Sequence, residues 1–226
     1  MKYPTYEEAA NLIIDIGGRM YSKNFVAAND GNISCKISDD TILITPTNVS
    51  KGFMTKESLV KMHLDGTIIS DNSKPSNDAQ SNNKPSSESK LHLRVYNENP
   101  EVGGVTHAHP PHSTAYAVVG RTLNVPILAE AILFLGTVPC VPYELTGTQE
   151  MADAITPYCK DYCALLLANH GALTWGTTPL EAFFRLETLE HYARILMYAE
   201  GIGGMNLLDE GQVKDLVQLR EKWAKK

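Results

Sequence analysis

The sequence predicts an α/β domain in which helices cover a central sheet. Helix-like and strand-like segments alternate along the chain, as they do in layered α/β domains. Residues 6–22 repeat apolar side chains at helical spacing. Residues 163–168 form a short, wholly apolar run of the kind found in interior strands.

The first helix is predicted over residues 6–22. Thr5 and Glu8 have the spacing of a capping box, in which two side chains satisfy backbone N–H groups at a helix start. Apolar residues that share one face of a helix then follow, namely Ala9, Leu12, Ile13 and Ile16.

A β-hairpin is expected next, with strands over residues 32–38 and 41–45 on either side of two aspartates. A further strand and turn are predicted over residues 64–69, around an Asp-Gly pair.

The composition changes abruptly at Ser70. From there to Lys90 the chain has no aliphatic or aromatic residue except Ala79, which fits either an interdomain linker or a solvated loop. Residues 1–69 alone would make a small, marginally stable unit. We therefore expect one domain over residues 1–226, with a polar loop over 70–87 within it.

The second half is expected to alternate helices and strands. The predicted elements are a helix ending near Asn99-Pro100, a buried strand over 102–107, a helix opening at Pro110 or Pro111, a strand over 163–168, a helix from Thr178 to about Glu200, and a last helix capped by Asp209. No internal repeat is evident.

The composition already excludes several classes of protein. The chain has 226 residues, of which 43% are hydrophobic, so it is neither a collagen-like nor a disordered polypeptide. Its net charge is −6, from 20 basic and 26 acidic residues, without basic runs. This excludes sequence-independent nucleic-acid binding and a cationic membrane-binding face. Any bound anion must therefore be held by a local pocket.

Four irregularly spaced cysteines do not form a disulfide pattern, and we expect free thiols. The N-terminus is not a signal peptide, and no segment approaches the roughly 18 apolar residues of a membrane helix. These features predict a cytoplasmic protein.

Three histidines occupy positions suited to a metal site. His107 and His109 follow the strand at 102–107, and residues two apart in extended chain point to the same side. His170 follows the apolar run at 163–168. Neutral imidazoles are common metal ligands, but a His-x-His pair also arises by chance, with hydrogen bonding at a strand end as the alternative.

A carboxylate follows the polar segment, in Pro85-Ser86-Ser87-Glu88. Backbone N–H groups and two hydroxyls at a helix start form a ready anion site. Glu88 would lie in the first turn, within reach of a metal or a substrate proton. The alternative is that the serines and Glu88 merely cap the helix.

Five short motifs occur in a characteristic order. They are Asp30-Gly31-Asn32-Ile33-Ser34, Ile44-Thr45-Pro46-Thr47, Lys84-Pro85-Ser86-Ser87-Glu88, His107-Ala108-His109-Pro110 and Ala168-Asn169-His170-Gly171. In this order the chain resembles the class II aldolase/adducin family from about residue 6 to about residue 200. The resemblance implies a three-layer α/β/α fold with a mainly antiparallel central sheet. It also implies a homotetramer whose active sites lie between subunits.

The resemblance assigns roles to individual residues. The implied metal ligands are Glu88, His107, His109 and His170, with Zn²⁺ as the expected ion and Mn²⁺ or Co²⁺ as alternatives. The implied phosphate-binding residues are Gly31, Asn32, Thr47, Asn48, Ser86 and Ser87. Many relatives have glycine at the position of Asn48.

The chemistry of the family explains these residue types. Cleavage of a ketose 1-phosphate leaves negative charge on the C2 oxygen, and a divalent cation stabilises that charge without a lysine Schiff base. Glu88 would act as acid/base at C3. The epimerases of the family have aspartate at this position, so Glu88 favours an aldolase.

The aldehyde side of the site departs from the family. An aldolase of this family uses a tyrosine from a neighbouring subunit and a second one in its C-terminal tail. Here the corresponding region, residues 126–130, ends in Glu130, and no tyrosine follows Tyr198. Glu130 is the candidate proton donor, and a helix-surface carboxylate is the alternative.

The sequence thus predicts a zinc-dependent aldolase, a lyase of carbohydrate metabolism. It would cleave a deoxyketose 1-phosphate, with L-fuculose 1-phosphate as first choice, to dihydroxyacetone phosphate and a short aldehyde such as lactaldehyde. Alternatives are 5-deoxyribulose-1-phosphate aldolase, ribulose-5-phosphate 4-epimerase and methylthioribulose-1-phosphate dehydratase. A non-catalytic, adducin-like interaction module is a different class, and the retained histidines argue against it.

Overall fold

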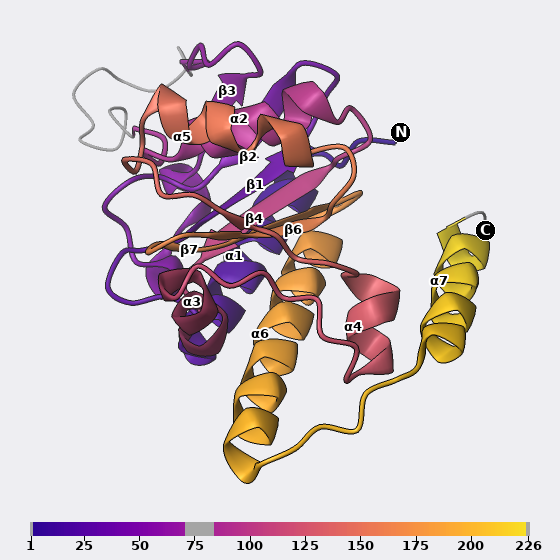
Figure 1. Cartoon of the computed structure of the whole chain (residues 1–226). Coiled ribbons are helices and arrows are strands. Elements are labelled where there is room, and N and C mark those ends of the chain that lie inside the picture. The colour runs from indigo at the N-terminus through magenta and orange to yellow at the C-terminus, as the bar shows by residue number, and fades with distance from the viewer. Residues whose placement is uncertain (1, 71–83, 225–226) are drawn as a thin grey trace.

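A seven-stranded sheet forms the centre of the molecule (Figure 1), in a computed structural model that describes residues 2–70 and 84–224. The strand order is β3-β2-β1-β4-β7-β6-β5. All neighbouring strands are antiparallel except β5 and β6, which are parallel. The strands are β1 (Asn32–Lys36), β2 (Thr41–Ile44), β3 (Val60–His63), β4 (Gly104–Ala108), β5 (Cys140–Val141), β6 (Ala164–Leu167) and β7 (Gly171–Gly176).

Helices cover both faces of this sheet, so the predicted α/β/α architecture is confirmed (Figure 1). The helices are α1 (Tyr6–Ser22), α2 (Ser89–Glu98), α3 (Pro111–Val118), α4 (Ala129–Phe134), α5 (Gln149–Ala154), α6 (Pro179–Ile202) and α7 (Glu210–Ala224). Helices α1, α3 and α6 pack on one face, and α2 and α5 pack on the other. Helix α7 packs against α4 at the edge of the molecule.

Alternation along the strands divides the core into two clusters. In β2, Leu43 faces the α1 and α6 side, whereas Ile42 and Ile44 face the α2 side. Successive side chains of a strand point to opposite faces, so a strand buried on both faces must be apolar throughout. This explains the uninterrupted apolar run of β6.

Most predicted elements are confirmed. Thr5 and Glu8 form a complete capping box at the start of α1, and the hairpin occurs as β1 and β2. Thr178 accepts a hydrogen bond from the backbone N–H of Glu181 at the start of α6. Asp209 likewise accepts one from the backbone N–H of Gln212 at the start of α7.

Other predictions need correction. The strand expected over 64–69 lies earlier, as β3, and residues 64–69 form the turn after it, with Gly66 at φ 93°. Strands β5 and β7 and helices α4 and α5 were not predicted, and β5, α4 and α5 are too short to show a clear periodicity. The predicted polar loop falls mostly on residues 71–83, outside the described residues.

All four cysteines are free, as expected. None of the described helices is long and apolar enough to cross a membrane.

Candidate metal site and phosphate pocket

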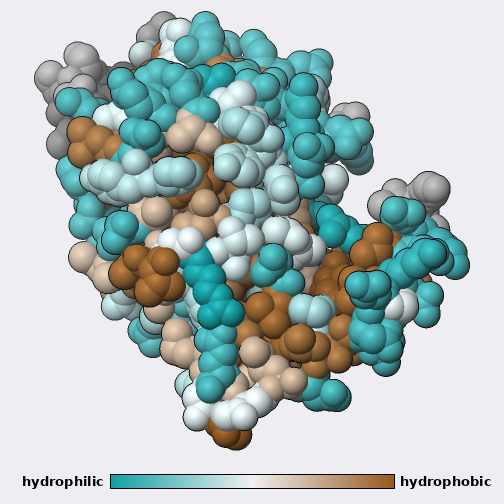
Figure 2. Space-filling view, viewed as in Figure 1, coloured by the Kyte–Doolittle hydropathy of each residue, from teal (hydrophilic) through white to brown (hydrophobic). Residues whose placement is uncertain are grey.

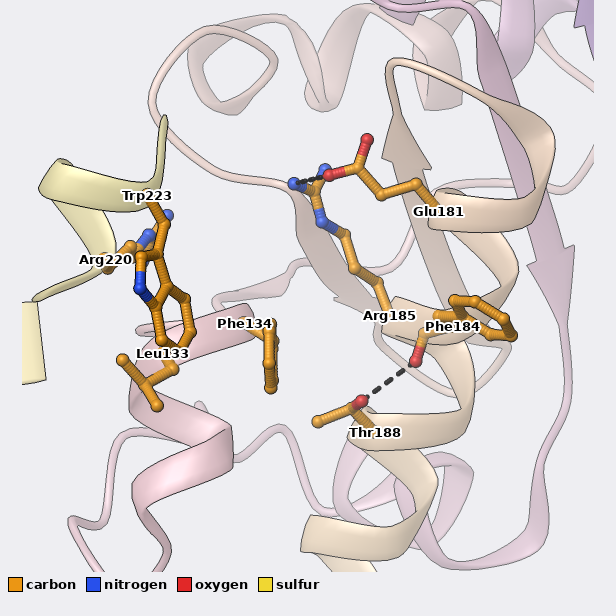
Figure 3. Close-up of a pocket in the computed structure, with 8 residues that line it drawn as sticks. All are labelled: Leu133, Phe134, Glu181, Phe184, Arg185, Thr188, Arg220 and Trp223. Carbon is orange, nitrogen blue, oxygen red and sulfur yellow. Dashed lines mark hydrogen bonds and ion pairs between the residues drawn. The ribbon is translucent and has the colours of Figure 1, made fainter. Parts of the chain in front are cut away.

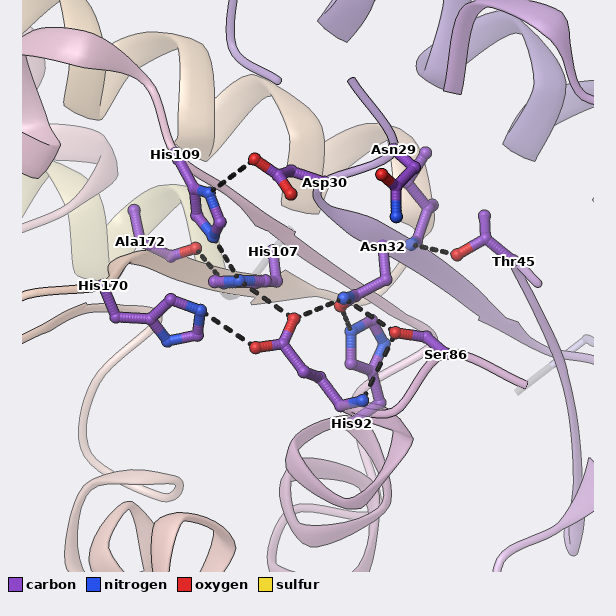
Figure 4. A network of polar contacts seen from close by, with 12 residues as sticks. Asn29, Asp30, Asn32, Thr45, Ser86, His92, His107, His109, His170 and Ala172 are labelled. Carbon is purple, nitrogen blue, oxygen red and sulfur yellow. Dashed lines mark hydrogen bonds and ion pairs between the residues drawn. The ribbon is translucent and has the colours of Figure 1, made fainter. Parts of the chain in front are cut away.

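Three histidine rings converge at the centre of the sheet (Figure 4). His107 lies in β4, His109 directly follows it, and His170 lies in the tight turn between β6 and β7. Each ring offers a nitrogen, and these nitrogens lie within 4.8 Å of one another. The Nε2 atoms of His107 and His109 are 3.1 Å apart. The structure therefore brings together all three histidines that the sequence singled out.

Backbone geometry places two of these rings. The Nδ1 atom of His107 lies 2.9 Å from the carbonyl oxygen of Ala172 on the neighbouring strand, which directs Nε2 toward the other rings. Gly171 follows His170, and a Cβ there would lie 2.5 Å from the ring of His109 and 2.5 Å from a backbone oxygen. Only glycine permits this close approach.

Glu88 faces the histidines from the start of α2. Its carboxylate oxygens lie 2.9 Å from Nε2 of His170 and 3.2 Å from Nε2 of His107. Its side chain makes no capping hydrogen bond to the helix. The alternative that Glu88 merely completes a helix cap therefore does not describe this structure.

The electrostatics of the cluster keep Glu88 ionised. Burial alone would raise the pKa of the Glu88 carboxyl, but His107 and His170 outweigh it and hold that pKa well below its usual range. Burial also lowers the pKa of His109 to about 3, with help from His107 and His170. A neutral His109 beside an ionised carboxylate is the state in which both groups can bind a cation.

A second set of hydrogen bonds holds Glu88 in place. The side-chain amide of Asn32 donates to Glu88 at 2.8 Å and to the hydroxyl of Ser86 at 3.0 Å. The oxygen of that amide lies 2.5 Å from Nε2 of His92, whose Nδ1 is 2.7 Å from the hydroxyl of Ser34. His92 is fully buried, and the sequence analysis missed this role because a histidine within a helix has no distinctive local pattern.

These donors fit a divalent metal ion. Ligands of a tetrahedral zinc ion at about 2.0–2.1 Å lie roughly 3.3 Å apart, close to the separation of the two Nε2 atoms. His170 also keeps a buried Nδ1 atom with no hydrogen-bond partner in the described part of the chain. Three imidazoles and one carboxylate form a ligand set that suits zinc.

A polar pocket of about 320 Å³ opens beside the histidines. Its lining includes all six residues expected to bind phosphate, which are Gly31, Asn32, Thr47, Asn48, Ser86 and Ser87. Gly31 has φ 77°, and a Cβ there would lie 3.0 Å from a backbone oxygen of His107. Asn48 has φ 60°, a left-handed conformation that asparagine adopts more readily than most other non-glycine residues. The backbone thus explains why glycine and asparagine can share this position.

The pocket also contains residues that the sequence analysis missed. They are Asn29, Asp30, Pro46, Lys51 and Thr146. Asp30 lies 3.5 Å from Nδ1 of His109, on the side of the ring away from the other histidines. Asp30 and Pro46 belong to two of the motifs quoted above but were given no role there, whereas nothing local indicated Lys51 or Thr146.

Glu130 lies elsewhere within a single chain. It is in α4 and lines a separate pocket with Phe25, Glu190 and His191. That pocket shares no residue with the one beside the histidines. The catalytic role of Glu130 therefore stays a prediction, and it would require a neighbouring chain.

A larger cavity is remote from this chemistry. It has a volume of about 620 Å³ and lies between α4, α6 and α7 (Figure 3). Phe134, Phe184 and Trp223 line it together with Arg185 and Arg220. It contains none of the histidines, so its size does not make it the functional site.

Comparisons with known proteins agree with this geometry. The family described as "Class II Aldolase and Adducin N-terminal domain" matches residues 11–197. An L-fuculose phosphate aldolase of Methanococcus vannielii is 32% identical over 78% of this chain and 88% of its own length. A 3-oxo-tetronate 4-phosphate decarboxylase of Haemophilus influenzae is 27% identical over 91% of this chain and 94% of its own. The crystal structure of YgbL from Klebsiella pneumoniae superimposes with a TM-score of 0.84 at 28% identity, covering 94% of this chain and 99% of that one.

Proposed function

Because the chain belongs to the class II aldolase and adducin family, whose aldolases are metal-dependent lyases, we propose that it is a zinc-dependent sugar-phosphate aldolase. The proposed substrate is a deoxyketose 1-phosphate, with L-fuculose 1-phosphate as first choice. The products would be dihydroxyacetone phosphate and a short aldehyde such as lactaldehyde. One observation carries this proposal: three histidines and Glu88 converge beside a pocket lined with hydroxyl and amide groups.

In this proposal His107, His109, His170 and Glu88 hold the metal ion. When bound, the divalent cation supplies the positive charge that stabilises negative charge on the substrate oxygens during bond cleavage. The carbonyl of Ala172 fixes the ring of His107, and Asp30 lies behind His109. Such partners orient the ligands and raise their basicity.

Glu88 is the proposed acid/base. Aldol cleavage breaks the bond between C3 and C4, and C3 then gains a proton in place of the departing aldehyde. In the direction of synthesis the ionised carboxylate of Glu88 would remove that proton from C3, and in cleavage the same group, after it has taken up a proton, would deliver it to C3. Asn32 and His92 hold the carboxylate in one orientation, so the proton is transferred at a defined position.

The substrate phosphate would bind in the polar pocket. Asn32, Thr47, Ser86 and Ser87 provide amide and hydroxyl donors, and Gly31 and Asn48 allow the backbone to turn around the phosphate. A chain with a net charge of −6 requires such a local site for an anion.

A related decarboxylation is the second candidate. A four-carbon 2-hydroxy-3-oxo acid with a 4-phosphate loses its carboxylate as CO₂ and gains a proton on C2, which also yields dihydroxyacetone phosphate. Aldol cleavage additionally requires a base for the hydroxyl proton of the departing aldehyde. In the described part of the chain, no tyrosine lines the pocket, and Glu130 lies outside it. Decarboxylation needs no such base, so it is equally compatible with the residues that a single chain brings to the pocket.

The test is a substrate panel assayed with the purified full-length protein. It contains L-fuculose 1-phosphate, 5-deoxyribulose 1-phosphate and 3-oxo-tetronate 4-phosphate, and each reaction is scored for dihydroxyacetone phosphate. Release of an aldehyde identifies an aldolase, whereas release of CO₂ identifies a decarboxylase. Metal-loaded protein that releases dihydroxyacetone phosphate from none of them would overturn the proposal.

We also propose a cytoplasmic homotetramer with active sites between subunits. Exposed apolar side chains gather around α4, α6 and α7, and Figure 2 shows them beside α7. They include Phe134, Phe184, Tyr198, Val217, Leu219 and Trp223. Burial against other copies would remove this apolar surface from water and would bring Glu130 toward a neighbouring site. The free cysteines suit a reducing compartment. Sedimentation analysis measures the number of chains, and a monomer at working concentration would contradict the tetramer.

A further inference from the structure

Lys51 is a buried cation in the phosphate pocket. It is only 2% exposed, although lysine side chains are rarely buried without a partner. Among the described residues that line the pocket, it is the single lysine or arginine. Two carboxylates, those of Asp30 and Glu88, line the same pocket. Among the described residues that line the pocket, the Lys51 ammonium is therefore the one lysine or arginine charge that can pair with a phosphate dianion.

Local packing fixes the position of this lysine. Lys51 opens the short 3-10 helix η1 (Lys51–Phe53), which packs against α1. A Cβ at Gly17 of α1 would lie 2.6 Å from the backbone oxygen of Lys51. The helix can approach this closely because Gly17 has no side chain. The backbone of Lys51 is consequently held against the core.

The ammonium group joins the two loops that form the pocket. It donates to the carbonyl oxygen of Asn29 at 2.8 Å and to that of Val49 at 2.6 Å. An ammonium has three N–H donors, and no third acceptor lies within hydrogen-bond distance in the described part of the chain. One donor is therefore available in a pocket lined by Thr47, Ser86 and other polar groups.

Burial makes an anion favourable at this position. It lowers the pKa of Lys51 to about 8, and Asp30 and Glu88 only partly offset this effect. Removing an ammonium from water is costly unless a counter-charge compensates for the lost hydration. A phosphate dianion in the pocket would provide that counter-charge.

We propose that Lys51 is a specificity-determining residue, which makes the pocket select a phosphorylated ligand over an uncharged one. This inference rests on the proposed function, because it assigns the phosphate of that substrate to this pocket. This role of Lys51 differs from that of the hydroxyl and amide donors in the pocket, which bind uncharged and charged groups alike. Lysine acts as a compact point charge and needs no bidentate geometry.

The test measures binding of inorganic phosphate to the full-length, cobalt-loaded protein. Cobalt(II) absorption reports the metal site at the same time. In Lys51→Met, phosphate affinity should fall about ten- to hundredfold, the weight of a charged hydrogen bond, while cobalt affinity and absorption stay unchanged. The matched control is Lys36→Met, which removes another buried lysine from β1, outside the pocket. It should bind phosphate like the wild type.

Further variants separate charge from structure. Lys51→Arg keeps the charge and should retain most of the phosphate affinity, whereas Lys51→Gln keeps a donor without the charge and should lose it. The inference is wrong if Lys51→Met binds phosphate within about twofold of the wild type. It is also wrong if the variant loses cobalt and phosphate together, or if Lys51→Arg loses as much as Lys51→Met.

The substrate panel keeps this inference distinct from the proposed function. If phosphate binding depends on Lys51 but no panel compound reacts, the proposed function fails and the role of Lys51 stands. If a panel compound reacts and Lys51→Met leaves its KM unchanged, the reaction stands and the role of Lys51 fails.

Discussion

The carboxylate of Glu190 accepts two hydrogen bonds from Ser113, one from its backbone N–H group at 2.8 Å and one from its hydroxyl at 2.9 Å. The other carboxylate oxygen accepts a hydrogen bond from the backbone N–H of His112 at 3.0 Å. Glu190 lies in α6, a helix far from α3 in sequence, and is 7% exposed. Its carboxylate therefore caps the first turn of α3. This turn begins at Pro111, two residues after His109.

Glu190→Gln should therefore destabilise the protein by about 2–4 kcal/mol, because a buried amide cannot accept all of these hydrogen bonds. The free energy of unfolding, measured with urea, checks this. Glu187→Gln is the matched control in the same helix. Its partly exposed ion pair with Lys23 should contribute at most about 1 kcal/mol. Equal losses in the two variants would contradict the capping role of Glu190.

Glu88→Gln should separate proton transfer from metal binding. The amide keeps an oxygen toward the histidines but cannot transfer a proton, so turnover should fall roughly 10²–10⁴-fold. The metal content should stay near that of the wild type, as measured by elemental analysis. Glu101→Gln, an exposed change outside the pocket, should leave turnover intact. Near-normal turnover in Glu88→Gln would remove Glu88 from the acid/base role.

His92→Gln tests the orientation of Glu88. His92 does not face the pocket, and it acts through Asn32, whose amide oxygen it contacts at 2.5 Å. Loss of such a supporting partner should lower kcat about 10- to 100-fold, with KM and metal content nearly unchanged. A purely structural role would reduce the amount of folded protein without changing kcat per metal-loaded chain, and steady-state kinetics would show the difference.

The same histidine makes folding sensitive to pH. Burial, and then His107, lower the pKa of His92 to about 3, below about 6.5 in the unfolded chain. Between these values the unfolded chain binds more protons, so stability should fall as the pH decreases below about 6.5. From pH 7.5 to pH 5, His92 should account for about 2 kcal/mol.

Urea unfolding at both pH values measures this loss. His92→Gln should lose less stability than the wild type over that range, because glutamine does not titrate. His191→Gln replaces an exposed histidine and should retain the dependence of the wild type. An unchanged dependence in His92→Gln would show that other groups cause the acid lability.

Metal removal should abolish activity and lower stability together. A chelator leaves His107, His109 and His170 without their proposed ion, and the stability that a ligand adds is lost with it. Elemental analysis should find one ion per chain, and zinc should restore both the activity and the melting temperature. Fully active protein that contains no divalent metal would contradict the metal role of these histidines.

Local signals explain which parts of the structure could be predicted from the sequence. The capping box of Thr5 and Glu8 and the apolar run of β6 each carry their cause within a few residues. Strand β7 lacked such a signal because Trp175 and its neighbours are buried by contacts with both adjacent strands. The turn of Asp65 and Gly66 was recognised, but the strand belongs before it.

The residues of the candidate site differ in the same way, because some carry a local signal and others depend on contacts distant in sequence. His107 lies in β4 and His109 directly follows it, so the pair could be recognised from its spacing, and Glu88 from the serines before it. Lys51 and His92 could not be recognised, because their roles depend on residues distant in sequence. Lys51 contacts the carbonyl of Asn29, and His92 contacts Asn32. The catalytic role of Glu130 stays a prediction, because a single chain does not bring it to the pocket beside the histidines.

The pairing of Asn32 with His107 across β1 and β4 has a consequence for how the chain folds. A shift of either strand by one residue would turn one of these side chains to the opposite face of the sheet. The proposed ligands His107 and His170 come from β4 and from the turn between β6 and β7, so the proposed metal site can form only after these strands have aligned. Uptake of the ion would therefore report the end of folding, and misaligned chains would go without it.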